Sequence, residues 1–158
     1  MLQDRVQLRM ESPEKTSQFA QAIGRSLGPG DVILLEGGVG AGKTHFARCL
    51  IQSLLNAPED VPSPTYTLVQ TYETSVGEVW HADLYRLTDI SEIDELGLSQ
   101  AFADAICLIE WPDRLGDQAP DKALYLRFET SGKDEERRVS MSWSAPIWDK
   151  KLQQVTHA

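Results

Sequence analysis

The chain has 158 residues, of which 41% are hydrophobic, and its 15 basic and 24 acidic residues give a formal net charge of −9. This length and apolar content suffice for one packed core, which argues against a disordered chain or a fold that depends on disulfides or metal. We expect residues 1–158 to form a single domain. An acidic protein is repelled by phosphate backbones. Direct binding to long nucleic acid is therefore disfavoured, because Lys133, Arg137 and Arg138 are interleaved with acidic residues.

The N-terminal region and the cysteines are typical of a cytoplasmic protein. Residues 1–14 mix charged side chains with no apolar run, so they lack the pattern of a signal peptide. The longest aliphatic runs have four or five residues, whereas a helix that spans a bilayer needs about 20. Cys49 and Cys107 lie in apolar stretches, where we expect buried free thiols. We therefore expect a cytoplasmic location and no membrane contact.

The spacing of apolar residues alternates between strand and helix in the first half of the chain. Ser12-Pro13 has the form of a helix start, and Gly28 is expected to stop the helix that follows. A short continuous apolar run after Gly30 predicts a strand that is buried on both faces. The expected order is strand, helix, strand and helix, over residues 6–10, 13–27, 31–35 and 43–55.

The second half begins with a loop over residues 56–64, which carries three prolines. Two strand pairs follow, and the β-forming residues in each indicate antiparallel hairpins. Between them we expect a helix that is broken at Gly97 and a further buried strand. The expected elements are strands at 65–73 and 76–82, a helix at 91–104, and strands at 105–109, 124–128 and 138–143.

The strongest motif is Gly-Gly-Val-Gly-Ala-Gly-Lys-Thr, which starts at Gly37 and satisfies G-x-x-x-x-G-K-[ST] between a predicted strand and a predicted helix. Glycines let successive N–H groups turn inward around phosphate oxygens, and the helix N-terminus faces the same anion. Lys43 is expected to reach the terminal phosphates and to serve in catalysis, and the Thr44 hydroxyl is expected to ligate Mg²⁺. The residues expected to bind the nucleotide here are Gly38, Val39, Gly40, Ala41, Gly42, Lys43 and Thr44.

This motif in this context predicts an α/β protein with the three-layer fold of P-loop NTPases. We expect a central mixed sheet, with a parallel core plus antiparallel hairpins, flanked by helices.

Two acidic residues end predicted strands, Asp83 after residues 79–82 and Glu110 after residues 106–109. In open α/β sheets, ligand-binding residues collect at the carboxyl ends of the strands. A P-loop enzyme needs carboxylates opposite the phosphates to hold the metal and orient water. We expect both acids to serve in catalysis and to hold Mg²⁺. The alternative for each is an ordinary exposed or capping acid.

Three further residues leave alternatives open. Thr65 lies where P-loop GTPases place a switch threonine, but it also fits an ordinary strand start after Pro64. His81 is one of three histidines, and we expect a packed or hydrogen-bonded residue there rather than a catalytic one. Trp111 is either a core aromatic residue or a lid against the nucleotide.

Together with residues 37–44, three motifs resemble the TsaE (formerly YjeE) family. They are Ser-Pro-Thr-Tyr-Thr-Leu-Val at 63–69, His-Ala-Asp-Leu-Tyr-Arg-Leu at 81–87 and Ile-Glu-Trp-Pro at 109–112. The resemblance runs from about Glu14 to Pro112. The chain departs from the family at Gly38, where Asp is frequent, and at His45, where a second Thr is frequent. Neither departure affects the phosphate-binding loop.

The resemblance implies a cytoplasmic, Mg²⁺-dependent ATPase that is required for threonylcarbamoyladenosine in tRNAs reading A-starting codons. It implies two partner proteins, TsaB and TsaD, of which TsaD transfers the threonylcarbamoyl group. Contact with tRNA would be only indirect, in agreement with the charge of −9. By matching position, Thr44 and Glu110 would hold magnesium, Asp83 would act in hydrolysis, and Thr16 and Trp111 would bind the nucleotide.

Two other functions stay open from the residues. A small-molecule P-loop kinase usually needs an arginine-rich lid, and the late loops offer few arginines. A nucleotide-gated binding module without hydrolysis would keep the same loop but would not need Glu110. Arg86 fits either a partner surface or a phosphate. Because no arginine finger from the chain itself is evident, we expect slow hydrolysis that partners stimulate.

Overall fold

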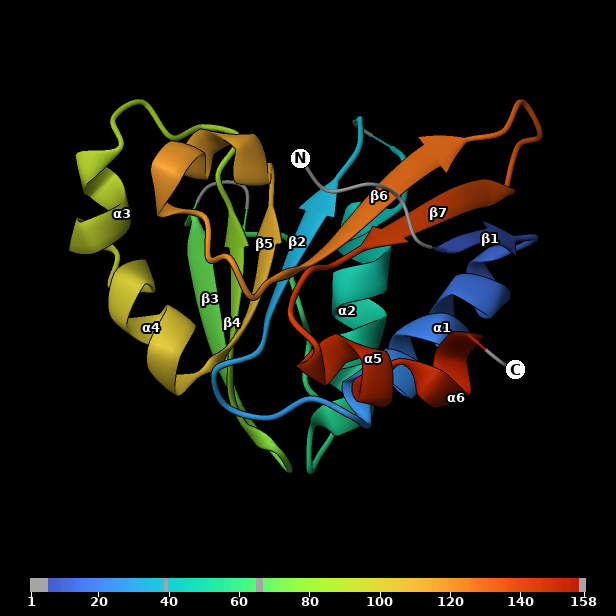
Figure 1. Ribbon diagram of the computed structural model, residues 1–158, viewed down its shortest axis with the longest axis horizontal. Coiled ribbons are helices and arrows are strands. Elements are labelled where there is room, and N and C mark those ends of the chain that lie inside the picture. The colour runs from blue at the N-terminus through green and yellow to red at the C-terminus, as the bar shows by residue number, and fades with distance from the viewer. Residues whose placement is uncertain (1–5, 39, 65–66, 157–158) are drawn as a thin grey trace.

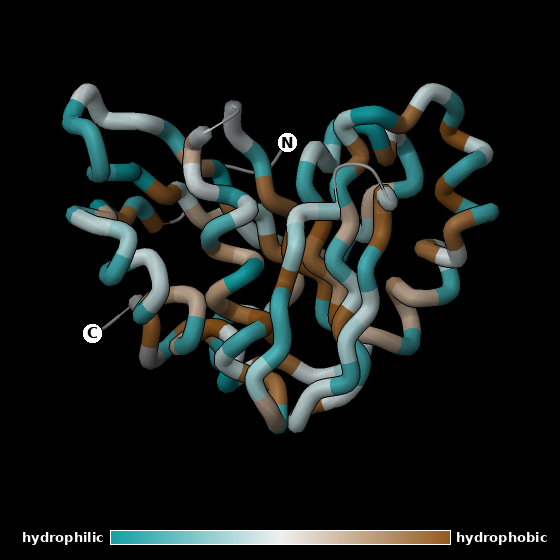
Figure 2. The backbone as a smooth tube through the Cα atoms, turned by 180° about the vertical axis from the view of Figure 1, so that it is seen from behind, coloured by the Kyte–Doolittle hydropathy of each residue, from teal (hydrophilic) through white to brown (hydrophobic). Residues whose placement is uncertain are grey.

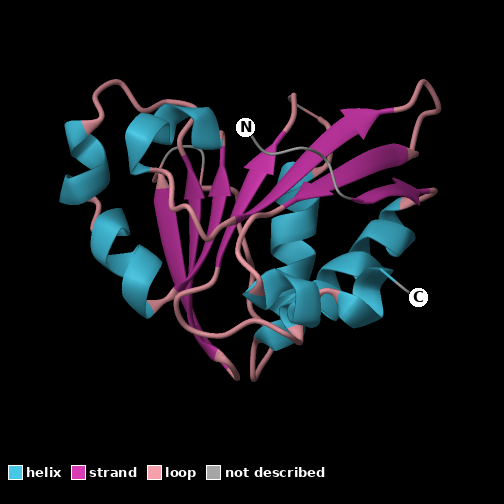
Figure 3. Ribbon diagram, viewed as in Figure 1, coloured by secondary structure: helices cyan, strands magenta, loops and turns pink. Residues whose placement is uncertain are grey.

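The structure is a computed structural model, and it describes residues 6–38, 40–64 and 67–156. Seven strands form one mixed sheet in the order β1-β7-β6-β2-β5-β4-β3 (Figure 1, Figure 3). β2 pairs in parallel with β5 and β6, and β4 pairs in parallel with β5, whereas the pairings of β1, β3 and β7 are antiparallel. The strands are β1 Val6–Met10, β2 Val32–Glu36, β3 Val69–Thr74, β4 Gly77–Asp83, β5 Ile106–Glu110, β6 Leu124–Thr130 and β7 Arg137–Ser142.

Helices cover both faces of this sheet (Figure 1). Alternate residues of β2 face opposite sides, because Ile33 and Leu35 pack with α1, α2 and the C-terminal helices, while Val32 and Leu34 pack with α3 and α4. Figure 2 shows hydrophobic residues along the central strands. The helices are α1 Pro13–Gly24, α2 Lys43–Leu54, α3 Ser91–Glu95, α4 Leu98–Asp104, α5 Ile147–Lys151 and α6 Gln153–Thr156, with a 3₁₀ segment, η1, at Pro112–Gln118.

The predicted three-layer α/β architecture and both antiparallel hairpins are confirmed. Ser12 caps α1 by accepting a hydrogen bond from the Lys15 amide at 3.3 Å. The break between α3 and α4 falls at Gly97, whose φ of 84° is left-handed. Within the described residues, no helix is long and apolar enough to cross a membrane.

The prediction that the first helix reaches Gly28 is wrong, because α1 ends at Gly24. The amide of Ser26 donates to the Ile23 carbonyl and that of Leu27 to the Gly24 carbonyl, which tightens the chain into a turn. The Ser26 hydroxyl also donates to the Ile23 carbonyl at 2.9 Å. Leu27 remains buried beyond the helix, so the apolar spacing continues after the helical backbone has ended.

The strand predicted at residues 65–73 also begins later than expected, because β3 starts at Val69. Leu68 has a φ of 68°, and its amide donates to the Pro64 carbonyl at 2.7 Å, so the extended backbone begins only after Leu68. Thr65, the predicted switch threonine, lies outside the described residues, as does Val39 of the glycine-rich loop.

Both cysteines are free, as predicted, but only one is fully buried. Cys107 lies inside β5, where burial raises the pKa of its thiol to about 12. Cys49 is half-buried on α2, with its Sγ atom 3.7 Å from Nε2 of His45. The prediction that both thiols are buried is therefore wrong for Cys49.

Candidate functional site

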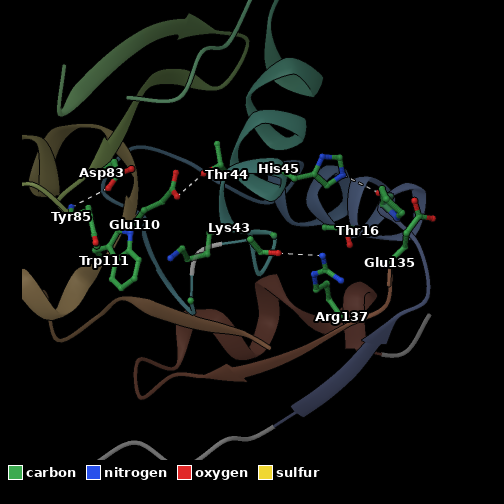
Figure 4. Close-up of a pocket in the computed structure, with 14 residues that line it drawn as sticks. Thr16, Lys43, Thr44, His45, Asp83, Tyr85, Glu110, Trp111, Glu135 and Arg137 are labelled. Atoms are coloured by element: carbon green, nitrogen blue, oxygen red, sulfur yellow. Dashed lines mark hydrogen bonds between the residues drawn. The ribbon is translucent and has the colours of Figure 1, made fainter. Parts of the chain in front are cut away.

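A cavity of about 620 Å³ lies over the carboxyl ends of β4 and β5 and the start of α2 (Figure 4). The glycine-rich loop lies along it, α1 and the β6–β7 loop close one end, and the two strand ends close the other. Its lining residues are Pro13, Thr16, Gly38, Gly40, Gly42, Lys43, Thr44, His45, Asp83, Tyr85, Glu110, Trp111, Glu135 and Arg137.

The loop that connects β2 to α2 needs glycine at both of its ends. Gly37 has a φ of 139°, and a Cβ atom there would lie 2.5 Å from the carbonyl oxygen of Phe128 in the neighbouring strand. Gly42 caps α2 with a left-handed φ of 110°. The 12-residue helix therefore begins at Lys43, beside the cavity, and its unpaired N-terminal amides can bind an anion there.

Lys43 is nearly buried, and its ammonium group lies within the cavity wall. Nζ donates a hydrogen bond to the Gly37 carbonyl and lies 3.7 Å from the centroid of the Trp111 ring. Burial lowers the pKa of Lys43, while the nearby carboxylates of Glu110 and Asp83 oppose this shift. The cation is therefore poorly solvated, and an incoming phosphate would compensate for the lost hydration.

Glu110 is a buried acid of the site, and both of its carboxylate oxygens have partners. One carboxylate oxygen, Oε1, accepts a hydrogen bond from the Thr44 hydroxyl at 2.7 Å, and the other, Oε2, lies 2.7 Å from Nε2 of His81. The side chain is 2% exposed. Asp83 lies opposite Glu110 in the parallel pairing of β4 and β5 and accepts a hydrogen bond from the Tyr85 amide at 3.0 Å. Both acids thus reach the same end of the cavity.

The oxygens of Glu110 and Thr44 suit a Mg²⁺ ion that is bound jointly with substrate phosphates. They do not form a site in which protein side chains alone hold the metal. Among the described residues, no group of three or more His, Cys, Asp and Glu side chains is arranged to hold a metal ion. Mg²⁺ typically takes one or two carboxylates together with substrate phosphates and water. The Thr44 hydroxyl and Glu110 offer such a partial set beside the glycine-rich loop, with Asp83 nearby.

Trp111 follows Glu110 in a left-handed conformation, with a φ of 58°. Its ring is half-buried and packs against Tyr85, with the ring centroids 4.9 Å apart and an interplanar angle of 50°. Both rings line the cavity next to Lys43. Of the two alternatives for Trp111, the structure favours a wall of the cavity over a core position.

The opposite end of the cavity takes side chains from three separate elements (Figure 4). Thr16 is buried on α1, and His45 on α2 lies 3.1 Å, through Nε2, from the Pro13 carbonyl. Arg137, the first residue of β7, donates from Nη2 to the Gly40 carbonyl at 3.2 Å. A cation of this chain therefore lies against the glycine-rich loop.

The structure brings the described predicted residues to one cavity, with Ala41 buried in the loop beneath it. Arg86 is exposed and does not line the cavity. Sequence reasoning missed Tyr85, Glu135 and Arg137. Arg137 was hidden because its neighbours in the chain are acidic, and only the position of β6 beside β2 brings the β6–β7 loop to this site. For Tyr85, its place two residues after Asp83 was an available signal.

The fold and the glycine-rich loop define a P-loop protein of the ATPase type. The family model described as "Threonylcarbamoyl adenosine biosynthesis protein TsaE" matches residues 10–139, and the chain belongs to this family.

Named relatives agree with this assignment. The chain is 36% identical over 130 residues to the tRNA threonylcarbamoyladenosine biosynthesis protein TsaE of Rickettsia bellii, which covers 82% of this chain and 89% of that protein. It is 42% identical over 106 residues to TsaE of Rickettsia felis, covering 67% of this chain but only 62% of that longer protein. The crystal structure of Bacillus subtilis YdiB superposes with a TM-score of 0.80 at 26% identity, covering 99% of this chain and 97% of that chain.

Proposed function

We propose that the protein binds and hydrolyses ATP with Mg²⁺ and serves in the synthesis of threonylcarbamoyladenosine in tRNAs that read A-starting codons. The observation that carries the ATPase proposal is the Thr44–Glu110 contact of 2.7 Å at the start of α2, beside the glycine-rich loop. The names of the relatives carry the pathway. The charge of −9 supports contact with tRNA through partner proteins, for which we propose TsaB and TsaD.

In this proposal the cavity-lining residues have distinct roles. The loop amides and Lys43 would bind the phosphates, and Thr44 and Glu110 would hold the metal, which would supply charge stabilisation at the transferring phosphoryl group. Asp83 faces the same end of the cavity and is proposed to orient the attacking water. Trp111, Thr16 and Arg137 also line the cavity. Trp111 would form the wall beside the terminal phosphates, and Thr16 and Arg137 would contact the rest of the nucleotide.

The roles of Val39 and Thr65 remain predictions, as does the cytoplasmic location. We propose that residues 1–158 act as one domain, which is supported by the continuous seven-stranded sheet. We also propose that hydrolysis by the isolated chain is slow. Lys43 and Arg137 are the lysine and arginine side chains among the described cavity-lining residues, and a further cation supplied by a partner can accelerate hydrolysis by about 10³–10⁵-fold.

The test is reconstitution of tRNA modification from threonylcarbamoyl donor, ATP, TsaB, TsaD and this chain. We expect threonylcarbamoyladenosine, measured by nucleoside mass spectrometry, to require the chain and hydrolysable ATP. Phosphate transfer to a small metabolite instead of water would favour a kinase. Full modification with a non-hydrolysable ATP analogue, over many cycles, would favour a nucleotide-gated binding module.

A further inference from the structure

His81 in β4 is a buried imidazole to which the proposed ATPase mechanism assigns no role. Its side chain is 0% exposed, and Nε2 lies 2.7 Å from Oε2 of Glu110. Among the described residues, the second ring nitrogen, Nδ1, has no hydrogen-bond partner. Burying a polar ring with one nitrogen unpaired costs free energy that an apolar side chain would not cost. This cost can be offset by a contact that an apolar side chain cannot make, which here is the contact of Nε2 of His81 with Oε2 of Glu110.

The sheet explains how the two side chains meet. β4 and β5 run parallel with Asp83 opposite Glu110, so His81 lies two residues earlier on the same face of β4. Val79, also on this face, packs in the cluster that contains α2. The imidazole of His81 therefore contacts Glu110 from within the sheet, and Thr44 contacts it from the start of α2.

The direction of the contact follows from the chemistry of the groups. A carboxylate oxygen accepts hydrogen bonds, so we assign the hydrogen of this contact to Nε2 of His81, which then donates to Oε2. The terminal torsion of a glutamate side chain is broad and has no strong preference of its own. A donor on Oε2 removes this freedom and leaves Oε1 directed at the Thr44 hydroxyl, at 2.7 Å.

We propose that His81 is a positioning residue that fixes the Glu110 carboxylate so that Oε1 and the Thr44 hydroxyl face the same Mg²⁺. This inference rests on the proposed ATPase function and adds to it a residue that touches neither nucleotide nor metal. Partners that orient a metal ligand in this way typically change metal affinity by about 10–100-fold.

The test uses two variants of nearly equal shape in the full chain, His81→Gln and His81→Met. Glutamine keeps a donor close to the position of Nε2, and methionine removes it. We expect the Mg²⁺ concentration that half-saturates ATP binding, measured by calorimetry, to rise about 10–100-fold in His81→Met. His81→Gln should stay close to wild type. Binding of ATP in excess EDTA should be the same in all three proteins, because His81 does not line the cavity.

If the wild-type chain requires Mg²⁺ and His81→Met requires the same Mg²⁺ concentration, the proposal for His81 alone is overturned. A wild type that binds ATP equally with and without Mg²⁺ would overturn the proposed function and the positioning role together. ¹⁵N NMR of the metal-free wild type gives a reading that does not depend on any variant folding. We expect the hydrogen of His81 on Nε2, and a hydrogen on Nδ1 with Nε2 bare would also overturn the proposal.

Discussion

The acid end of the cavity takes Asp83 and Glu110 from adjacent strands of the parallel core, whereas the opposite end takes Thr16, His45 and Arg137 from three separate elements. At the acid end both carboxylates are at most 5% exposed, and Glu110 is held from two sides. At the opposite end Arg137 is half-buried and its neighbour Glu135 is exposed. The sheet alone places the acid end, whereas the other end, here called the adaptable end, includes the largely exposed β6–β7 loop. Chemistry that needs exact placement belongs at the acid end.

Glu110→Gln tests the acid end and should give the largest effect. The amide keeps the size of the side chain but replaces an oxygen that we propose binds the metal, so we expect ATP turnover to fall by about 10²–10⁴-fold. Phosphate release assays with TsaB and TsaD present would measure it. Glu73→Gln, at an exposed position of β3, is the matched control and should not change turnover. Wild-type turnover in Glu110→Gln would show that hydrolysis does not depend on the acid end of the cavity.

Lys43→Met tests the middle of the cavity and separates binding from stability. Loss of a charged hydrogen bond to phosphate is worth about 1.5–3 kcal/mol, so we expect ATP affinity to fall by roughly 10–150-fold. Because burial lowers the pKa of Lys43, the charged side chain is disfavoured in the folded protein without ligand. The unfolding temperature of the variant should therefore not fall. Lys150→Met, at an exposed site of α5, controls for lost charge, and calorimetry and thermal unfolding are the measurements.

Arg137→Ala tests the adaptable end. Its guanidinium contacts the Gly40 carbonyl but lies partly in solvent, so removing it should cost about 0.5–1.5 kcal/mol of binding, or roughly 2–10-fold in ATP affinity. Arg138→Ala is the matched control, because that neighbouring arginine is exposed and does not line the cavity. Equal effects of the two substitutions on ATP binding would reflect only the loss of one positive charge and would show that Arg137 is not part of the nucleotide site.

The same contrast decides what the sequence could predict. Glu110 and the glycine-rich loop were readable because each depends on its own local pattern, an apolar strand that ends in an acid and a motif between strand and helix. The hairpins were readable for the same reason. Arg137 depends on the order of the strands, since β6 lies beside β2 only after the sheet has formed. The contact of His81 with Glu110 likewise needs the parallel register of β4 and β5, which no local pattern specifies.

Chemical labelling of the two cysteines tests the same difference between the two ends of the cavity, and it perturbs the protein least. Burial in β5 raises the pKa of Cys107 to about 12, so at pH 8 only about one thiol in 10⁴ is the reactive thiolate. Cys49 is half-buried on α2 beside His45, at the adaptable end. We expect iodoacetamide at pH 8 to add one group per native chain, at Cys49, as read by mass spectrometry.

Cys49→Ser should abolish this labelling, and unfolding in denaturant should restore it at Cys107. Labelling of Cys107 in the native chain should stay far slower than that of Cys49, because Cys107 is fully buried in β5 and its thiolate is disfavoured there. Rapid labelling of native Cys107 at pH 8 would mean that the parallel core opens on the timescale of the reaction. Glu110, three residues further along the same strand, would then lose the rigid support on which the acid end depends.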